Sequence, residues 1–74
     1  MKERILKVVS QVLKTEVDEN TSQKNCTQWD SLHHLNLIIE LEMEFDVSFE
    51  PEEIASMKSV AIIEEMIMSK IGKV

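Results

Sequence analysis

Apolar residues recur every three or four positions in several stretches of the chain, and this spacing predicts helices. In the first stretch the recurring positions are Ile5, Val8, Val9 and Val12. Pro51 suits the first turn of a short helix, and Ser59 can cap the helix after it. The predicted helices cover residues 3–15, 31–45, 51–57 and 60–71. We therefore expect an all-α four-helix bundle with a short third helix.

The segment between the first two predicted helices, residues 16–30, is polar and shows no helical spacing. A connection of this length is costly in a small domain unless it packs onto the surface or has a function. Val17, Cys26 and Trp29 are the residues that we expect to anchor it. The sequence thus predicts a long loop that is packed against the bundle.

The second predicted helix carries apolar residues on two opposite faces. The first face consists of Leu37, Ile38, Leu41 and Phe45, and the second (the Leu32 face) of Leu32, Leu35, Ile39 and Met43. One apolar face is enough for the core of a small bundle. Only three other helices are available to cover the second, and one of them is very short. We therefore expect the Leu32 face to stay exposed and to contact a partner protein.

The chain is small, with 74 residues, one cysteine and a formal net charge of −6. We expect one domain over residues 1–74. A single cysteine excludes a disulfide within the chain, and no secretory leader or long apolar segment is recognisable. These features favour a cytoplasmic protein that does not enter a membrane.

Acidic residues dominate the middle of the chain, because no Lys or Arg lies between Lys24 and Lys58. The acids in this stretch are Asp30, Glu40, Glu42, Glu44, Asp46, Glu50, Glu52 and Glu53. They would repel the phosphates of nucleic acid and would suit partner enzymes with basic patches. We therefore expect a monomer that binds no nucleic acid.

The stretch around Ser31 contains the residue types of a hydrolase triad, with Asp30, His33 and His34 beside the serine. A triad needs a base within hydrogen-bond reach of the hydroxyl, but a helix turns His33 about 200° away from Ser31. Either Asp30 or Ser31 can cap the helix, and capping by Asp30 competes with orienting a histidine. Asp30 and His34 are the nearest candidate pair of metal ligands, and two ligands do not make a complete metal site. We therefore expect neither enzymatic activity nor a metal site.

Ser31 also stands where a phosphate could be attached. Its hydroxyl lies at the predicted start of a helix, where unpaired amides and the helix dipole favour negative charge. A serine at such a position can also act as the helix cap, and serine before an apolar run is common. On the residues alone, the helix cap is the expected role.

The run Asp30-Ser31-Leu32, followed ten residues on by Leu41-Glu42-Met43-Glu44-Phe45, resembles the acyl carrier proteins, and the resemblance covers the whole chain. It implies that Ser31 carries 4'-phosphopantetheine, which a phosphopantetheinyl transferase adds from coenzyme A, with Asp30 and Leu32 beside the attachment point. The thiol of that arm would hold acyl intermediates as thioesters. The carrier itself would have no catalytic activity.

The resemblance also implies a set of partners and a surface that binds them. The partners would be an acyl- or aminoacyl-loading enzyme and downstream transferases or synthases with basic patches. The surface would comprise the Leu32 face together with Asn36, Glu40, Glu42 and Glu44. Cargo that folds inward would enter between the second and third helices, near Phe45, Ile54, Met57 and Ile63.

The chain departs from the usual pattern of fatty-acid-synthesis carriers beside the serine. Gln28-Trp29 replace a Gly-Ala pair, and His33 and Asn36 stand where acids are usual. The resemblance is therefore greater to stand-alone carriers of specialised pathways, such as polyketide or peptide biosynthesis. Acyl cargo is expected, with aminoacyl or peptidyl cargo as the alternative and a helical adaptor without a prosthetic group as the second class. We expect His33 to be solvated and His34 to be half-buried and hydrogen-bonded.

Overall fold

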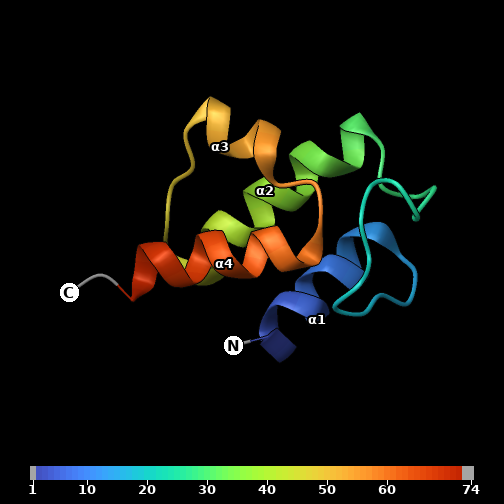
Figure 1. Ribbon diagram of the computed structural model, residues 1–74, viewed down its shortest axis with the longest axis horizontal. Helices are drawn as coiled ribbons and strands as arrows, with labels where there is room; N and C mark the ends of the chain where they lie inside the picture. Colours follow the sequence, from blue (N-terminus) through green and yellow to red (C-terminus); the bar gives the residue numbers. More distant parts are fainter. Residues whose placement is uncertain (1, 73–74) are drawn as a thin grey trace.

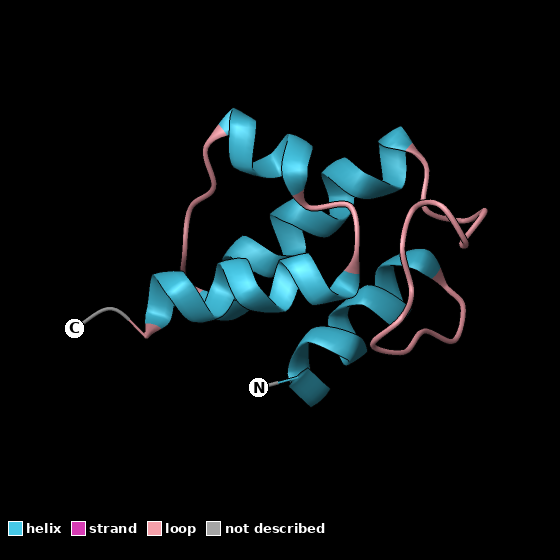
Figure 2. Cartoon of the chain, viewed as in Figure 1, coloured by secondary structure: helices cyan, strands magenta, loops and turns pink. Residues whose placement is uncertain are grey.

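The computed structural model describes residues 2–72 as four helices joined by loops (Figure 1). The helices are α1 (Lys2–Leu13), α2 (Ser31–Phe45), α3 (Pro51–Ser56) and α4 (Val60–Ile71). Every regular element of these residues is a helix (Figure 2), apart from an isolated bridge between Ser22 and Ser59. The all-α prediction is confirmed. None of the four helices combines the length and the apolar character needed to span a bilayer.

Two helices, α2 and α4, begin and end at the predicted residues, whereas α1 is displaced. It begins at Lys2 and ends at Leu13 rather than at residue 15. The reason is that Lys14 has a φ of 56°, and a residue in this left-handed region ends a helix. Likewise α3 ends at Ser56, before the predicted residue 57.

The core is formed by one apolar face from each of α1, α2 and α4. Val9 from α1, Leu41 from α2 and Ile67 from α4 are fully buried. The expected core face of α2 is confirmed by four buried side chains, Leu37, Ile38, Leu41 and Phe45. Ile71 is exposed and lies in the last turn of α4. The short helix α3 contributes no buried residue.

The connection between α1 and α2 is packed against the bundle, as predicted. Trp29 is buried, and Val17 and Cys26 are half-buried against the core. The Val60 N–H donates a hydrogen bond to the Thr21 carbonyl at 2.9 Å, which joins the loop to the start of α4. These contacts offset part of the conformational entropy that ordering a long loop costs.

Replacing Leu41 with alanine tests whether the two faces of α2 differ energetically. Leu41 is fully buried, whereas Met43 on the same helix is 66 % exposed. We expect Leu41→Ala to lower the free energy of unfolding by about 2–5 kcal/mol, because it removes buried methyl groups and leaves a cavity. The control Met43→Ala should change it by less than about 0.5 kcal/mol. Urea denaturation followed by circular dichroism measures both, and equal losses would contradict the assignment of the core face.

Candidate functional site

The start of α2 is capped by Asp30, which places Ser31 as the first residue of the helix. The backbone of Asp30 is extended, with φ −98° and ψ −175°. Its Oδ1 accepts a hydrogen bond from the His33 N–H at 2.9 Å, and its carbonyl accepts one from the His34 N–H at 2.8 Å. Of the two residues that could cap the helix, the structure therefore uses Asp30, and Ser31 is left for another role.

Ser31 is exposed, and its polar groups are available to a ligand. Among the hydrogen bonds of residues 2–72, none involves the Ser31 hydroxyl or the N–H groups of Ser31 and Leu32. These two amides belong to the set that every helix start leaves without an intrahelical partner. Together with the positive end of the helix dipole, they favour a phosphate attached at the Ser31 oxygen.

His33, and not His34, contacts the Asp30 carboxylate. The His33 Nδ1 lies 2.8 Å from Asp30 Oδ1, the same oxygen that caps the helix. The expectation that capping competes with orienting a histidine is therefore wrong, because a residue three positions after the cap can reach the cap side chain with both its backbone and its ring. The backbone N–H and then the ring of His33 hold the pKa of Asp30 below its ordinary value.

His34 is buried and hydrogen-bonded through both ring nitrogens. The Trp29 Nε1–H donates to His34 Nδ1 at 2.9 Å, and His34 Nε2 lies 2.8 Å from the Ile54 carbonyl. Since Nδ1 accepts from the indole, the proton of the neutral ring is on Nε2, which donates to the carbonyl. His34 thus joins the end of the long loop, the first turn of α2 and the middle of α3. The expectation that it is hydrogen-bonded is confirmed, and its burial is greater than expected.

The Leu32 face of α2 is exposed, as predicted. Its four side chains have exposed fractions of 67 % for Leu32, 56 % for Leu35, 53 % for Ile39 and 66 % for Met43. No other element of residues 2–72 covers it. A row of large apolar side chains exposed along one helix is typical of a protein–protein contact surface.

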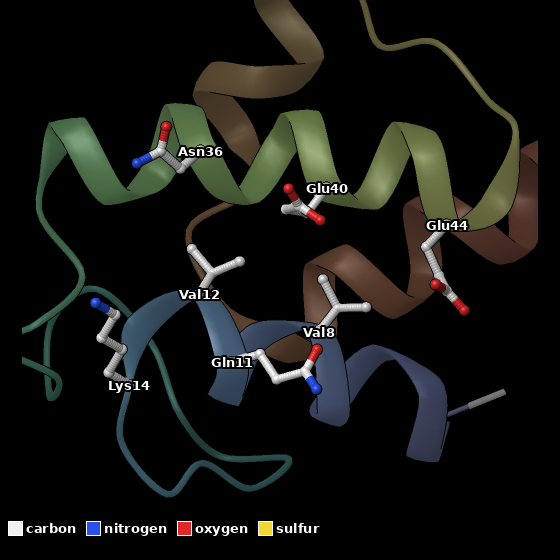
Figure 3. Close-up of a pocket in the computed structure, with 7 residues that line it drawn as sticks. All are labelled: Val8, Gln11, Val12, Lys14, Asn36, Glu40 and Glu44. Carbon is white, nitrogen blue, oxygen red and sulfur yellow. The ribbon is translucent and has the colours of Figure 1, made fainter.

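Three of the four polar residues expected beside this face lie towards α1. Asn36, Glu40 and Glu44 line an open groove of about 360 Å³ between the two helices (Figure 3). On the α1 side it is lined by Val8, Gln11, Val12 and Lys14. The Glu44 carboxylate is already paired with Arg4, whose Nη2 lies 3.0 Å from its Oε2. Of these three predicted partner residues, Glu44 therefore also has a structural role.

The region expected to receive cargo is part of the closed core. Phe45, Met57 and Ile63 are buried, and Ile54 is half-buried against them. Two hollows among the described residues lie elsewhere, one between α1 and α2 and the other beside the α3–α4 connection. Within residues 2–72 no group of three His, Cys, Asp or Glu side chains could hold a metal ion.

Sequence reasoning missed the partners of both histidines. The contact between Asp30 and His33 could have been found from their spacing of three residues across a helix start. No local signal indicates the bond from His34 to the Ile54 carbonyl, because it joins two helices. The nearest clue is Trp29, an aromatic donor close to a buried histidine.

No family model matches the chain, and no curated protein matches it. Solved structures of acyl carrier proteins do match its fold. A provisionally named acyl carrier protein from Mycobacterium tuberculosis has a TM-score of 0.82 and 26 % sequence identity, over 92 % of this chain and 95 % of that chain. The solution structure of the holo acyl carrier protein from Geobacter metallireducens has a TM-score of 0.84 and 25 % identity, over 97 % of this chain and 86 % of that chain.

The chain is acyl-carrier-protein-like. This agrees with the resemblance that the sequence around Ser31 suggested. The expected acyl-carrier-like bundle, with its short third helix and its long loop between the first two helices, is confirmed. In this acyl-carrier-like chain, Ser31 opens the helix that also carries the exposed Leu32 face.

Replacing Trp29 with phenylalanine tests the buried hydrogen bond to His34. The variant keeps an aromatic ring but leaves His34 Nδ1 without its donor. We expect the free energy of unfolding to fall by about 1–3 kcal/mol, the cost of a buried acceptor that has no partner. Urea denaturation followed by circular dichroism measures the change. In a double-mutant cycle with His34→Leu, the two losses should not add, and full additivity would show that the pair does not interact.

Replacing Asp30 with asparagine tests the charge at the helix start, because asparagine can still cap the helix. The pKa of Asp30 is lower in the folded chain than in the unfolded chain, so the charge stabilises the fold above the ordinary pKa of about 3.9. This stabilisation is lost as the pH falls through the folded pKa. The stability difference between wild type and Asp30→Asn, measured by urea denaturation from neutral pH downward, should shrink below about pH 4. A difference that is constant with pH would exclude this role.

Proposed function

We propose that the chain is an acyl carrier protein, a single carrier domain that holds acyl intermediates as thioesters on a 4'-phosphopantetheine arm at Ser31. The observation that carries the proposal is the exposed Ser31 at a helix start whose cap is already supplied by Asp30. The similarity to acyl carrier proteins, one of them in the holo form, supports it. The chain would present its cargo to separate enzymes and would catalyse no step itself.

The residues around Ser31 fit the phosphate end of such an arm. The N–H groups of Ser31 and Leu32 are the donors nearest in sequence to the attachment oxygen, and the dipole of α2 adds positive potential. Asp30 holds this turn in shape by capping it. The arm would supply the thiol on which an acyl group is carried. A phosphopantetheinyl transferase would add it from coenzyme A.

The Leu32 face is the surface that we propose for partner enzymes. It runs from the attachment residue along α2, so a partner that binds it would also reach the cargo. Of the three glutamates in α2, only Glu40 has a carboxylate that forms no hydrogen bond or ion pair within residues 2–72, since the Glu42 carboxylate accepts from the Phe49 N–H and Glu44 pairs with Arg4. A basic patch on a loading enzyme, transferase or synthase would therefore meet Glu40 first, with Asn36 beside it.

The departures at His33 and Asn36 favour a carrier of a specialised pathway. Where an acid would stand beside the serine, His33 instead shares the Asp30 carboxylate. This lowers the negative charge that a general fatty-acid enzyme would meet beside Ser31. Acyl cargo is the leading assignment, with aminoacyl or peptidyl cargo as the alternative.

Intact-protein mass spectrometry tests the proposal. The purified chain is incubated with coenzyme A and a broad-specificity phosphopantetheinyl transferase. We expect wild type to gain one phosphopantetheine and Ser31→Ala to gain none. Ser48→Ala is the matched control, because Ser48 is another exposed serine, outside the helices, and it should be modified like wild type.

The competing function is a helical adaptor that uses the Leu32 face without any prosthetic group. The exposure of that face would support an adaptor equally well. Failure of two different transferases to modify a chain with the circular dichroism spectrum of a folded helical protein would overturn the carrier proposal. The adaptor would then be the better explanation of the exposed face.

A further inference from the structure

A second hollow lies where the long loop meets the connection between α3 and α4. Its volume is about 540 Å³, and it is lined by Ser22, Gln23, Lys24, Lys58 and Ser59. Neither the proposed attachment of an arm nor the Leu32 face uses these residues. In Figure 1 the two segments are the teal loop after α1 and the orange connection that precedes α4.

The walls of this hollow are fixed by backbone hydrogen bonds. The Gln23 N–H donates to the Lys58 carbonyl at 2.9 Å, and the Val60 N–H donates to the Thr21 carbonyl at 2.9 Å. Ser22 and Ser59 form an antiparallel bridge between the same two segments. The hollow is therefore preformed, and a ligand would not pay the entropy of ordering a loop.

The side chains of the hollow are rich in hydrogen-bond donors and include no acid. Lys24 and Lys58 supply ammonium groups, and neither forms an ion pair among residues 2–72. The Ser59 hydroxyl accepts from the Ile62 N–H, so its own O–H is available to donate. In a chain with 14 acids and 8 basic residues, a hollow with two lysines and no carboxylate is suited to an anion.

The aliphatic stems of the two lysines add an apolar component. A lysine side chain lays its methylene groups along a surface while its ammonium group stays in water. A ligand with a short apolar body and an anionic end would match both parts. A bare inorganic ion would use only the charge.

A hydrogen bond and a short stretch of chain link the first turn of α2 to the hollow. His34 is one turn after Ser31, about 4.5 Å along the helix axis, and its ring is hydrogen-bonded to Ile54. Lys58 follows Ile54 by four residues, so their Cα atoms are at most about 14 Å apart. The helix that begins at Ser31 is therefore joined, through His34 and Ile54, to the segment that carries Lys58.

We propose that this hollow is a subsite for the anionic end of the cargo, a carboxylate on a short acyl group tethered at Ser31. The proposal rests on the proposed carrier function and specifies the class of cargo. Lys24 and Lys58 bind the carboxylate, and the lysine stems contact the acyl carbons. A neutral acyl group of the same length would have no carboxylate to pair with the two lysine ammonium groups.

The first experiment tests anion binding without any arm. Succinate and, separately, inorganic phosphate are titrated into the apo chain at low ionic strength, where charge interactions are least screened. We expect saturable shifts of the backbone amide signals of Ser22, Gln23, Lys58 and Ser59 in ¹H–¹⁵N spectra, larger for succinate. The double variant Lys24→Gln, Lys58→Gln should lose them. The control Lys7→Gln, Lys14→Gln removes the same charge from exposed positions elsewhere and should keep them.

The second experiment compares two cargoes on the same arm. The chain is loaded from succinyl-coenzyme A or butyryl-coenzyme A, two four-carbon groups that differ in a terminal carboxylate, and loading is confirmed by mass. Succinyl cargo should shift the four amide signals and butyryl cargo should not, and the lysine double variant should remove the difference.

The outcomes separate the subsite from the carrier function. If the chain gains no arm, the carrier function fails, and the titration alone decides whether the hollow binds anions. If the titration is saturable but the succinyl- and butyryl-loaded chains give identical spectra, the hollow binds free anions and not the tethered cargo, and the cargo proposal is overturned. No saturable shift in the titration and identical spectra of the two loaded forms overturn the subsite.

Discussion

The hydrogen-bonded chain from Trp29 through His34 to the Ile54 carbonyl is the constraint on which the site depends. It satisfies both nitrogens of a buried imidazole, which would otherwise carry the cost of unpaired polar groups. It also reaches α3, which has no buried residue of its own and is otherwise held by the ion pair of Glu53 with Lys70 and by the half-buried Ile54. Because one side chain joins the loop, α2 and α3, the position of Ser31 follows from the packing of all three.

The helix α2 has to serve the core and the surface at once. Leu41 and its neighbours on one face are buried, whereas the Leu32 face meets solvent. The acids between the two faces have partners within the fold near the end of the helix. The Glu42 carboxylate accepts a hydrogen bond from the Phe49 N–H, and the Glu44 carboxylate pairs with Arg4. Fewer of the carboxylates in α2 are therefore free to contact a partner than the sequence indicated. Under the proposed function, a partner of the Leu32 face would therefore meet mainly apolar side chains.

The parts of the fold that depend on local spacing could be predicted from the sequence, and those that depend on contacts between elements could not. The limits of α2 and α4 follow from periodicity and caps, and so does the exposure of the Leu32 face. The early end of α1 depends on the left-handed conformation of Lys14, a residue type that carries no signal for it. For the site, the position of Ser31 at a helix start was predictable. The contact between His34 and Ile54 was not, because it requires the packing of α3 against α2.

The distribution of charge in space differs from its distribution along the chain. Lys24 and Lys58 bracket the acidic stretch in the sequence, and the pairing of Ser22 with Ser59 brings them to one hollow. The same folding that leaves the Leu32 face outward thus gathers, beside the start of α4, two lysines that form no ion pair within residues 2–72. A large apolar face suits a protein, whereas a small hollow with hydrogen-bond donors suits a small anion. Under the proposed functions, the two features would therefore divide recognition of partner and of cargo between separate surfaces.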